Sequence, residues 1–206
     1  MEERPMGAGA ELWVVRHGET EWSLSGKHTS RTDVALTDQG RVRAEELRDY
    51  LAGRSFDAVL TSPMQRARET CRIAGYGGQA EVEEGLREWD YGVYEGRTTK
   101  EIRETEPGWS VWKDAIREGE TVEHVGERAD AVIRRAIDAV GEREHGRVLL
   151  FAHAHILRIV AARWIDLPAR DGRLLALGTG SLSVLGWERE TRVIASWNRS
   201  FEEEPA

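Results

Sequence analysis

An arginine and a histidine stand together where an apolar run ends near the start of the chain. Residues 12–15 are Leu-Trp-Val-Val, and Arg16, His17 and Gly18 follow directly. The guanidinium of arginine offers a planar fork of donors that matches phosphate oxygens, and a neutral imidazole is a nucleophile near neutral pH. The four residues Arg-His-Gly-Glu could also simply end a strand, with a solvated arginine and a hydrogen-bonded histidine. The rest of the sequence must therefore distinguish a phosphate site from a structural role. The stretch predicts a phosphate-binding site at the carboxyl end of a buried strand.

Two further apolar runs end in basic side chains where a helix is expected to begin. Residues 56–60 are followed within one helical turn by Arg66, and residues 147–152 are followed directly by His153. Because ligands of parallel sheets bind at the carboxyl ends of the strands, these side chains are predicted to converge with the first pair. Such a cluster would neutralise the charge of a phosphate dianion and of the transition state for phosphoryl transfer. It would bind phosphate whether or not the protein hydrolyses the ester.

A carboxyl group is available to complete the chemistry. Attack by His17 would form a phosphohistidine, and the leaving alkoxide would then need a proton. Glu88 lies in an aromatic and acidic loop, 86–96, whose rings would desolvate it, and once ionised it would activate the water that releases phosphate. The arginines supply the positive charge, so the scheme needs no metal ion or other cofactor. His153 and His155 have no carboxylates at suitable spacing, so no metal site is predicted.

Strands and helices alternate along the chain. Strands are expected at 12–16, 56–60, 80–83 and 147–152, with a closing hairpin of 182–187 and 192–197. Helices are expected from Thr37 with Val42, Leu47 and Leu51 inward, from Pro63 within a Ser62/Gln65 capping box, at 98–105, at 109–117, at 121–140 and after His155. The pattern predicts an α/β fold, a three-layer α/β/α sandwich with a mostly parallel central sheet.

The length fits one domain over residues 1–206. Residues 1–10 and 202–206 are expected to be flexible tails. Residues 18–36 show no periodicity and are expected to be a long functional loop, and residues 86–119 an excursion that partly covers the sheet edge as a lid.

The composition narrows the partners and the location. The formal net charge of −8 argues against a nucleic-acid binder or a protein of anionic membranes, so an anionic substrate must be held by local cations. No apolar run reaches the roughly 18 residues of a membrane span, and the first residues resemble no targeting signal. The lone Cys71 excludes an internal disulfide and is expected in the core. We expect a cytoplasmic protein and leave a homodimer open.

Taken together, the motifs resemble the histidine phosphatase superfamily, in its phosphoglycerate-mutase-like branch. The matching segments are Arg16-His17-Gly18-Glu19-Thr20, residues 62–70, Leu86-Arg87-Glu88 with Gly92 and Glu95-Gly96, and Ala152-His153 with Arg158. The resemblance runs from the first strand to the final hairpin and implies a phosphoglycerate-mutase-like fold. It also implies that His17 is the phosphorylated nucleophile and Glu88 the proton donor. The residues that it implies hold the phosphoryl group are Arg16, Arg66 and His153.

Within the branch, residues 20–29, residues 89–96 and the spacing from His153 to Arg158 resemble sedoheptulose bisphosphatases and broad-specificity acid phosphatases. The asparagine and the Glu-Arg-His-Tyr-Gly segment of true mutases are not found, which favours a phosphatase over a cofactor-dependent phosphoglycerate mutase. Ala154 and Ser30 stand where glycine is usual in this subgroup. A non-catalytic phospholigand-binding module is the alternative of another class, disfavoured because nucleophile and proton donor are both present.

The predicted substrate is a small phosphate monoester, either a sugar phosphate or bisphosphate or an aryl phosphate. The candidate substrate-binding residues are Trp22, Ser23, Lys27, His28, Thr29, Trp89, Tyr91, Ala154 and His155. Lys27, His28 and Arg31 would bind a second phosphate or a sugar hydroxyl, or else be solvated. The aromatic residues would line the pocket or pack in the core. By analogy with the family, an acidic pH optimum is expected.

Overall fold

A six-stranded sheet forms the centre of the computed structural model, which describes residues 9–141, 143 and 145–201. The strands lie in the order β3-β2-β4-β1-β5-β6. They are β1 (Glu11–Arg16), β2 (Ala58–Thr61), β3 (Ala80–Val82), β4 (Arg147–Ala152), β5 (Leu182–Glu188) and β6 (Thr191–Arg199). The first four run parallel, and the β5–β6 hairpin pairs antiparallel with β1, as predicted.

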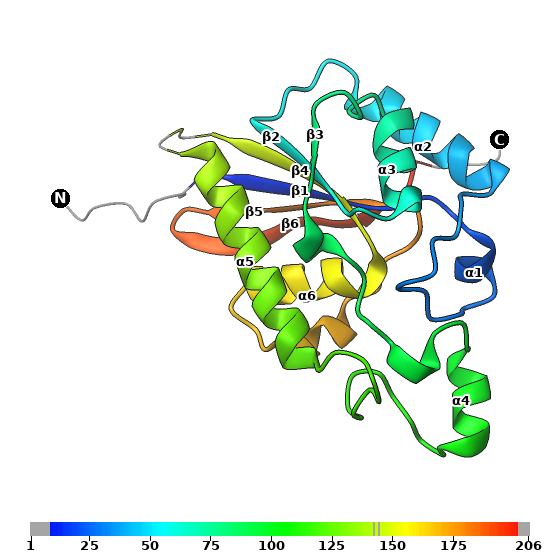
Figure 1. The fold of residues 1–206 in the computed structure, drawn as a ribbon. Helices are drawn as coiled ribbons and strands as arrows, with labels where there is room; N and C mark the ends of the chain where they lie inside the picture. The colour runs from blue at the N-terminus through cyan, green and yellow to red at the C-terminus, as the bar shows by residue number, and fades with distance from the viewer. Residues whose placement is uncertain (1–8, 142, 144, 202–206) are drawn as a thin grey trace.

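Helices cover both faces of this sheet (Figure 1). The helices of the described residues are α1 (Glu21–Leu24), α2 (Asp38–Leu51), α3 (Gln65–Ile73), α4 (Thr99–Thr105), α5 (Val122–Val140) and α6 (Ala154–Trp164), with short 3₁₀ turns at Glu84–Leu86, Gly92–Tyr94 and Ala169–Leu174; α1 and α4 lie beyond the strand ends. Helices α2 and α3 lie on one face, and α5 and α6 on the other (Figure 1). The predicted three-layer α/β/α sandwich with a mostly parallel sheet is confirmed.

The covering on both faces explains why the strands read as continuous apolar runs. In β1, Leu12 and Val14 join the apolar cluster beneath α5 and α6, whereas Trp13 and Val15 join the cluster beneath α2 and α3. Cys71 of α3 is buried in the second cluster, in agreement with the expected core position, and burial raises the pKa of its thiol to about 12.

Helix α2 begins as predicted, but its buried face differs from the predicted one. Thr37 caps the helix by accepting a hydrogen bond from the backbone N–H of Gly40 at 3.0 Å. Val42 is 44% exposed, so its predicted inward position is wrong. The buried positions, spaced three or four residues apart, are Gly40, Ala44, Leu47 and Leu51. Val42 falls between them because 3.6 residues complete a turn.

The predicted start of the third helix is also wrong. Helix α3 begins at Gln65, and its N-cap residue is Met64, which makes no side-chain capping bond. Ser62 accepts a hydrogen bond from the backbone N–H of Met64 at 3.3 Å instead of capping a helix that starts at Pro63. Arg66 still lies in the first turn, so its predicted position near the sheet edge is kept.

Two irregular segments differ from the expectation as well. The loop 18–36 contains the single turn α1, which Thr20 and Ser23 stabilise through a capping box. Residues 109–117 form turns and no helix. The carboxylate of Asp114 accepts from the backbone N–H of Ser110 at 2.7 Å, and such a local bond offers the backbone an alternative to helical pairing.

The segment 86–119 leaves the sheet and extends beyond the strand ends, carrying α4 with it (Figure 1). Its function as a lid stays a prediction. The predicted flexible tails lie outside the described residues, apart from residues 9 and 10. No helix in the described part of the chain is both long and apolar enough to span a bilayer.

Candidate active site

The sheet register brings the two predicted histidines together. Arg16 at the end of β1 is the register partner of Ala152 at the end of β4, so the residues that follow, His17 and His153, leave the same edge side by side. Their ring centroids lie 5.1 Å apart. Arg66 reaches this edge from α3, and its Nε donates to Nδ1 of His153 at 3.1 Å. The predicted convergence of the basic residues is therefore found in the structure.

His17 is held as a neutral imidazole with a free lone pair on Nε2. Its Nδ1 lies 2.7 Å from the carbonyl oxygen of Gly18, which can only accept, so Nδ1 carries the proton. Burial, together with the charges of Arg66 and Arg16, lowers the pKa of His17 to about 3. The imidazole is therefore deprotonated at Nε2 near neutral pH, the form that a nucleophile requires.

Arg16 presents a buried donor that lacks an acceptor. One terminal nitrogen donates to the carbonyl oxygen of Leu177 at 2.5 Å, whereas Nε is buried and has no hydrogen-bond partner among the described residues. An unsatisfied buried donor costs roughly 1–3 kcal/mol, and more when it is charged. An anion beside His17 would satisfy it, so Arg16 marks an anion-binding position.

Arg66 and His153 lie behind His17, and neither contributes to the wall of the cleft described below. Arg66 is 1% exposed, and its guanidinium also donates to the carbonyl oxygens of Thr32 and Thr29 at 3.1 and 3.2 Å. Because Nδ1 of His153 accepts from Arg66, Nε2 carries the proton and donates to Oγ of Ser62 at 2.8 Å. Burial and the adjacent Arg66 hold the pKa of His153 well below its usual range.

The carboxylate of Glu88 caps helix α6 from a distant part of the chain. It accepts from the backbone N–H groups of His155 at 3.1 Å, Ile156 at 3.0 Å and Trp89 at 3.0 Å. The first two belong to the first turn of α6, whose own N-cap residue, His153, makes no side-chain capping bond. Glu88 thus occupies the place where a helix dipole favours negative charge.

This placement changes the expected ionisation of Glu88. Burial by itself raises the pKa of the carboxyl group, as the aromatic loop led us to expect. Interactions with His155, including the hydrogen bond from its backbone N–H, and with His153 outweigh burial and hold the pKa of Glu88 well below its usual range. The carboxylate is therefore ionised in this structure, and its proton must arrive with, or because of, the substrate.

A cleft of about 450 Å³ opens beside His17, Arg16 and Glu88. Seven of the nine candidate substrate-binding residues line it: Ser23, Lys27, His28, Thr29, Tyr91, Ala154 and His155. Trp22 and Trp89 do not. The ring of Trp22 lies under the ammonium group of Lys27, and Trp89 is 1% exposed, with its indole N–H on the carbonyl oxygen of Glu120. Arg31 also points elsewhere and pairs with Asp90.

The cleft includes residues that sequence reasoning missed. They are Thr20, Gly26, Thr99, Arg103, Ser110, Val111, Trp112, Arg158 and Leu177. Arg158 lies four residues after Ala154 on α6, a spacing that puts both on one helix face and was a usable signal. Its guanidinium lies 4.7 Å from the ring centre of Trp112. Arg103 and Trp112 come from the segment 86–119, whose irregular path no local pattern encodes.

His155 is bound to an aromatic neighbour rather than arranged for a metal. The hydroxyl group of Tyr91 lies 2.6 Å from its Nδ1. Burial, and next the charge of Glu88, raises the pKa of Tyr91 well above its usual value, so the hydroxyl donates and Nδ1 accepts. Among the described residues, no three His, Cys, Asp or Glu side chains gather in a way that could hold a metal ion.

Comparisons with known proteins agree with this geometry. The sequence profile of the histidine phosphatase superfamily (branch 1) matches residues 12–200. An acid phosphatase from Mycobacterium tuberculosis is 41% identical over 186 residues, which cover 89% of this chain and 90% of its own. Sedoheptulose 1,7-bisphosphatase from Saccharomyces cerevisiae is 36% identical over 183 residues, covering 75% of this chain and 67% of its own. A solved structure of a Mycobacterium tuberculosis protein covers 94% of this chain and 99% of its own at 39% identity, with a TM-score of 0.87.

Relatives named for mutase activity are more distant. A probable phosphoglycerate mutase from Cronobacter sakazakii is 26% identical, over 91% of this chain and 89% of its own. The mutase alternative is therefore less supported than a phosphatase, as the lack of the mutase segments in the sequence indicated.

Proposed function

This chain belongs to branch 1 of the histidine phosphatase superfamily and is a phosphatase, and we propose that it hydrolyses small phosphate monoesters through a phosphorylated His17, without a metal ion. The observation that carries the proposal is that a neutral His17, with Nε2 unprotonated, and Arg16, whose buried Nε has no partner among the described residues, line the same cleft. A nucleophile and an anion donor side by side are what phosphoryl transfer requires.

The residues divide the reaction into two steps. In the first, Nε2 of His17 attacks phosphorus, the ester P–O bond breaks, and the leaving alkoxide takes a proton from Glu88. In the second, the ionised Glu88 takes a proton from water, the water oxygen attacks phosphorus, and the P–N bond breaks to release inorganic phosphate. Arg16 stabilises the phosphoryl charge from the wall of the cleft, and the buried Arg66, which donates a hydrogen bond to His153, adds its positive charge through space, as it does on His17.

The ionisation of Glu88 sets the proton balance of the first step. Since this carboxylate is ionised in the structure, the proton for the leaving group enters with the substrate monoanion, whose pKa is about 6 and which passes the proton to Glu88. The negative phosphoryl group then raises the proton affinity of Glu88. Activity should therefore be favoured at acidic pH, where the monoanion is abundant.

The cleft favours substrates that are anionic beyond the reacting phosphate. Lys27 and Arg103 line it: the ammonium group of Lys27 lies over the ring of Trp22, and Nε of Arg103 donates to the carbonyl oxygen of Trp109 at 2.9 Å. Sugar bisphosphates would place their second phosphate near these cations, and the aromatic edge of Trp112 and Tyr91 would accept a sugar or aryl group. We therefore propose sugar phosphates, sugar bisphosphates and aryl phosphates as the substrate class.

The test is phosphate release, with a chelator present, from an aryl phosphate, 3-phosphoglycerate and sugar mono- and bisphosphates. Wild-type enzyme should release phosphate, and His17→Ala should abolish it. His145→Ala, which replaces an exposed histidine outside the cleft, is the matched control and should leave the rate unchanged. Undiminished turnover by His17→Ala, or tight phosphate binding with no turnover of any ester, would overturn the proposal.

Three finer expectations accompany this proposal. We propose a cytoplasmic location from the single cysteine, no nucleic-acid partner from the net charge of −8, and a monomer or homodimer as the assembly. Cell fractionation, a nucleic-acid binding assay at low salt and light scattering would each test one of them.

A further inference from the structure

The proposed proton donor, Glu88, lies on an irregular segment that the sheet does not hold. Its carboxylate rests on the first turn of α6, but its backbone follows the 3₁₀ turn Glu84–Leu86 and belongs to no strand or helix. A general acid must stay within hydrogen-bond reach of the leaving oxygen, and a misplacement of 1 Å can cost about a hundredfold in rate. Something outside the sheet has to fix this segment.

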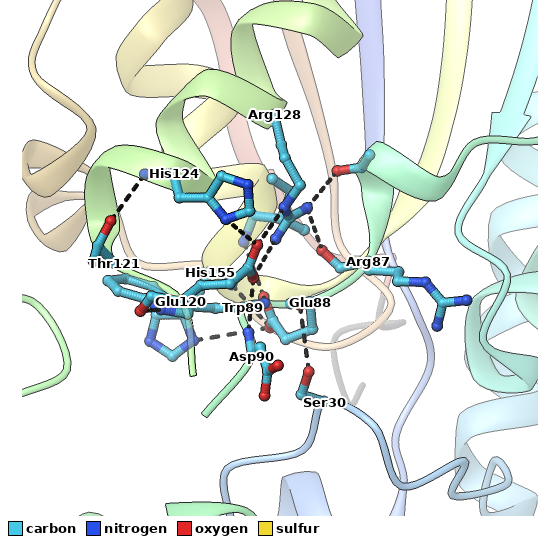
Figure 2. A network of polar contacts seen from close by, with 12 residues as sticks. Ser30, Arg87, Glu88, Trp89, Asp90, Glu120, Thr121, His124, Arg128 and His155 are labelled. Carbon is cyan, nitrogen blue, oxygen red and sulfur yellow. Dashed lines mark hydrogen bonds and ion pairs between the residues drawn. The ribbon is translucent and has the colours of Figure 1, made fainter. Parts of the chain in front are cut away.

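Arg128 of α5 binds the segment on the side that precedes Glu88. One of its terminal nitrogens donates to the carbonyl oxygens of Gly85 at 2.7 Å and Arg87 at 3.1 Å (Figure 2). The other two guanidinium nitrogens donate to the two carboxylate oxygens of Glu120, each at 2.8 Å. The planar guanidinium thus bridges the segment and a carboxylate in one fixed geometry.

Glu120 binds the segment on the side that follows Glu88. Its carboxylate accepts from the backbone N–H of Asp90 at 3.0 Å, and its carbonyl oxygen accepts from the indole N–H of Trp89 at 2.9 Å. Its own backbone N–H donates to the carbonyl oxygen of Asp90 at 3.0 Å. Figure 2 shows Glu120 lying between Arg128 and the backbone of residues 89–90.

The ion pair therefore binds the backbone on both sides of Glu88. From these contacts we infer that the Arg128–Glu120 ion pair positions Glu88 as the proton donor, and that neither member touches the substrate. The two side chains are 18% and 15% exposed, so solvent screens their attraction less than that of surface pairs. They line a second cavity of about 420 Å³ behind Glu88 and do not line the substrate cleft.

His124 is a second side chain beside the same carboxylate. Its Nδ1 lies 3.0 Å from Oε1 of Glu120, and its side chain is 59% exposed. In the described part of the chain no hydrogen bond or ion pair joins it to residues 85–90, so we place it outside the positioning pair.

The inference rests on the proposed function, because it assumes that Glu88 donates the proton. The test must therefore separate loss of the donor from loss of its positioning. Esters with different leaving groups do so, because 2,4-dinitrophenolate departs without a proton, whereas an alkoxide does not. The measured quantity is kcat/KM, which reports the step up to phosphorylation, for 2,4-dinitrophenyl phosphate, phenyl phosphate and glycerol 2-phosphate.

Removal of the Glu88 carboxyl group should slow the ester with the poor leaving group far more than the ester with the good one. Glu88→Gln should lose about a hundredfold or more on glycerol 2-phosphate and much less on the dinitrophenyl ester. Arg128→Met and Glu120→Gln should show the same pattern at about tenfold on glycerol 2-phosphate, with less than about a twofold change on the dinitrophenyl ester. Arg128→Lys keeps the charge but cannot reach the four acceptors of the guanidinium, so it should resemble Arg128→Met.

The chain offers a matched control. Arg163 of α6 makes a similar two-bond ion pair, donating to Asp130 of α5 at 2.8 and 3.0 Å, but among the described residues it has no hydrogen bond or ion pair with residues 85–90. Arg163→Met should leave the leaving-group dependence unchanged, even if it lowers the thermal midpoint of unfolding. This variant shows how the loss of an ion pair on α5 affects kcat/KM through protein stability alone.

The outcomes separate the two ideas. If Glu88→Gln loses equally on all three esters, Glu88 is not the proton donor, and the mechanism under the proposed function fails. If Glu88→Gln shows the pattern while Arg128→Met and Arg128→Lys lose equally on all esters, or lose nothing, the positioning inference alone is overturned.

Discussion

Burial of His17 beside two arginines should make the protein less stable in acid, by an amount that follows from its pKa. The pKa of His17 falls from the ordinary 6.5 to about 3 in the folded protein. Between these values the unfolded chain binds a proton that the folded protein does not, so stability decreases as pH falls through this window. At pH 5 the difference amounts to about 2 kcal/mol, and at pH 8 it vanishes.

Replacing His17 with asparagine removes this titration. The free energy of unfolding of the wild type should therefore fall by about 2 kcal/mol more than that of His17→Asn between pH 8 and pH 5. For a chain of this length that corresponds to roughly 4–8 °C in the thermal midpoint. Urea unfolding followed by fluorescence of the eight tryptophans measures the difference. Buffers must be free of phosphate, because an anion bound to the folded site would add stability of its own.

The control is His145→Asn, the same substitution at an exposed position. It should leave the difference between the two pH values as it is in the wild type. Equal losses for wild type and His17→Asn would refute the reasoning, since His17 would then titrate alike in the folded and unfolded chain.

Three further outcomes follow from the site and its supports. The value of kcat/KM should rise with pH near pH 3, where His17 becomes neutral, and should fall above about pH 6, where the substrate monoanion is lost. A value of kcat/KM that rises above neutral pH would contradict this. Gly40→Ala should destabilise the fold by about 1–3 kcal/mol in urea unfolding and lower kcat, because the new methyl group would lie 2.3 Å from the carbonyl oxygen of Glu19 near the nucleophile; full stability and activity would show that this close approach is unimportant. Lys27→Ala should raise KM for a sugar bisphosphate more than for the monophosphate, whereas Arg31→Ala, whose side chain pairs with Asp90, should not; equal effects of both variants on both substrates would remove Lys27 from substrate recognition.

The positions of residues that directly follow a strand could be predicted from the sequence. His17 and His153 each follow an apolar run, and parallel strands end at one edge, so the convergence followed from local patterns alone. The start of α3 was predicted wrongly because a contact from elsewhere in the chain decides it. Pro63 and Ser62 have the types that begin a helix, yet Ser62 is instead engaged by Nε2 of His153, a partner 91 residues away in sequence.

The state of Glu88 was beyond sequence reasoning for a different reason. Its neighbours in the chain are aromatic and predict desolvation, but the residues that lower its pKa are His155 and His153, and its carboxylate accepts from the N–H groups of His155 and Ile156 at the start of α6. That contact joins segments 67 and 68 residues apart. The cleft wall contributed by Arg103 and Trp112 was missed for the same reason, since the path of 86–119 depends on tertiary contacts.

The central claim is that the reaction passes through phosphorylated His17. The most direct measurement is acid-free rapid quenching of the enzyme during turnover of a good substrate, followed by peptide mass spectrometry. We expect one phosphoryl group on the peptide that contains His17, stable in alkali, labile in acid and missing from His17→Ala. A phosphoryl group on another residue, or none at all while the wild type shows a burst of alcohol release, would contradict it.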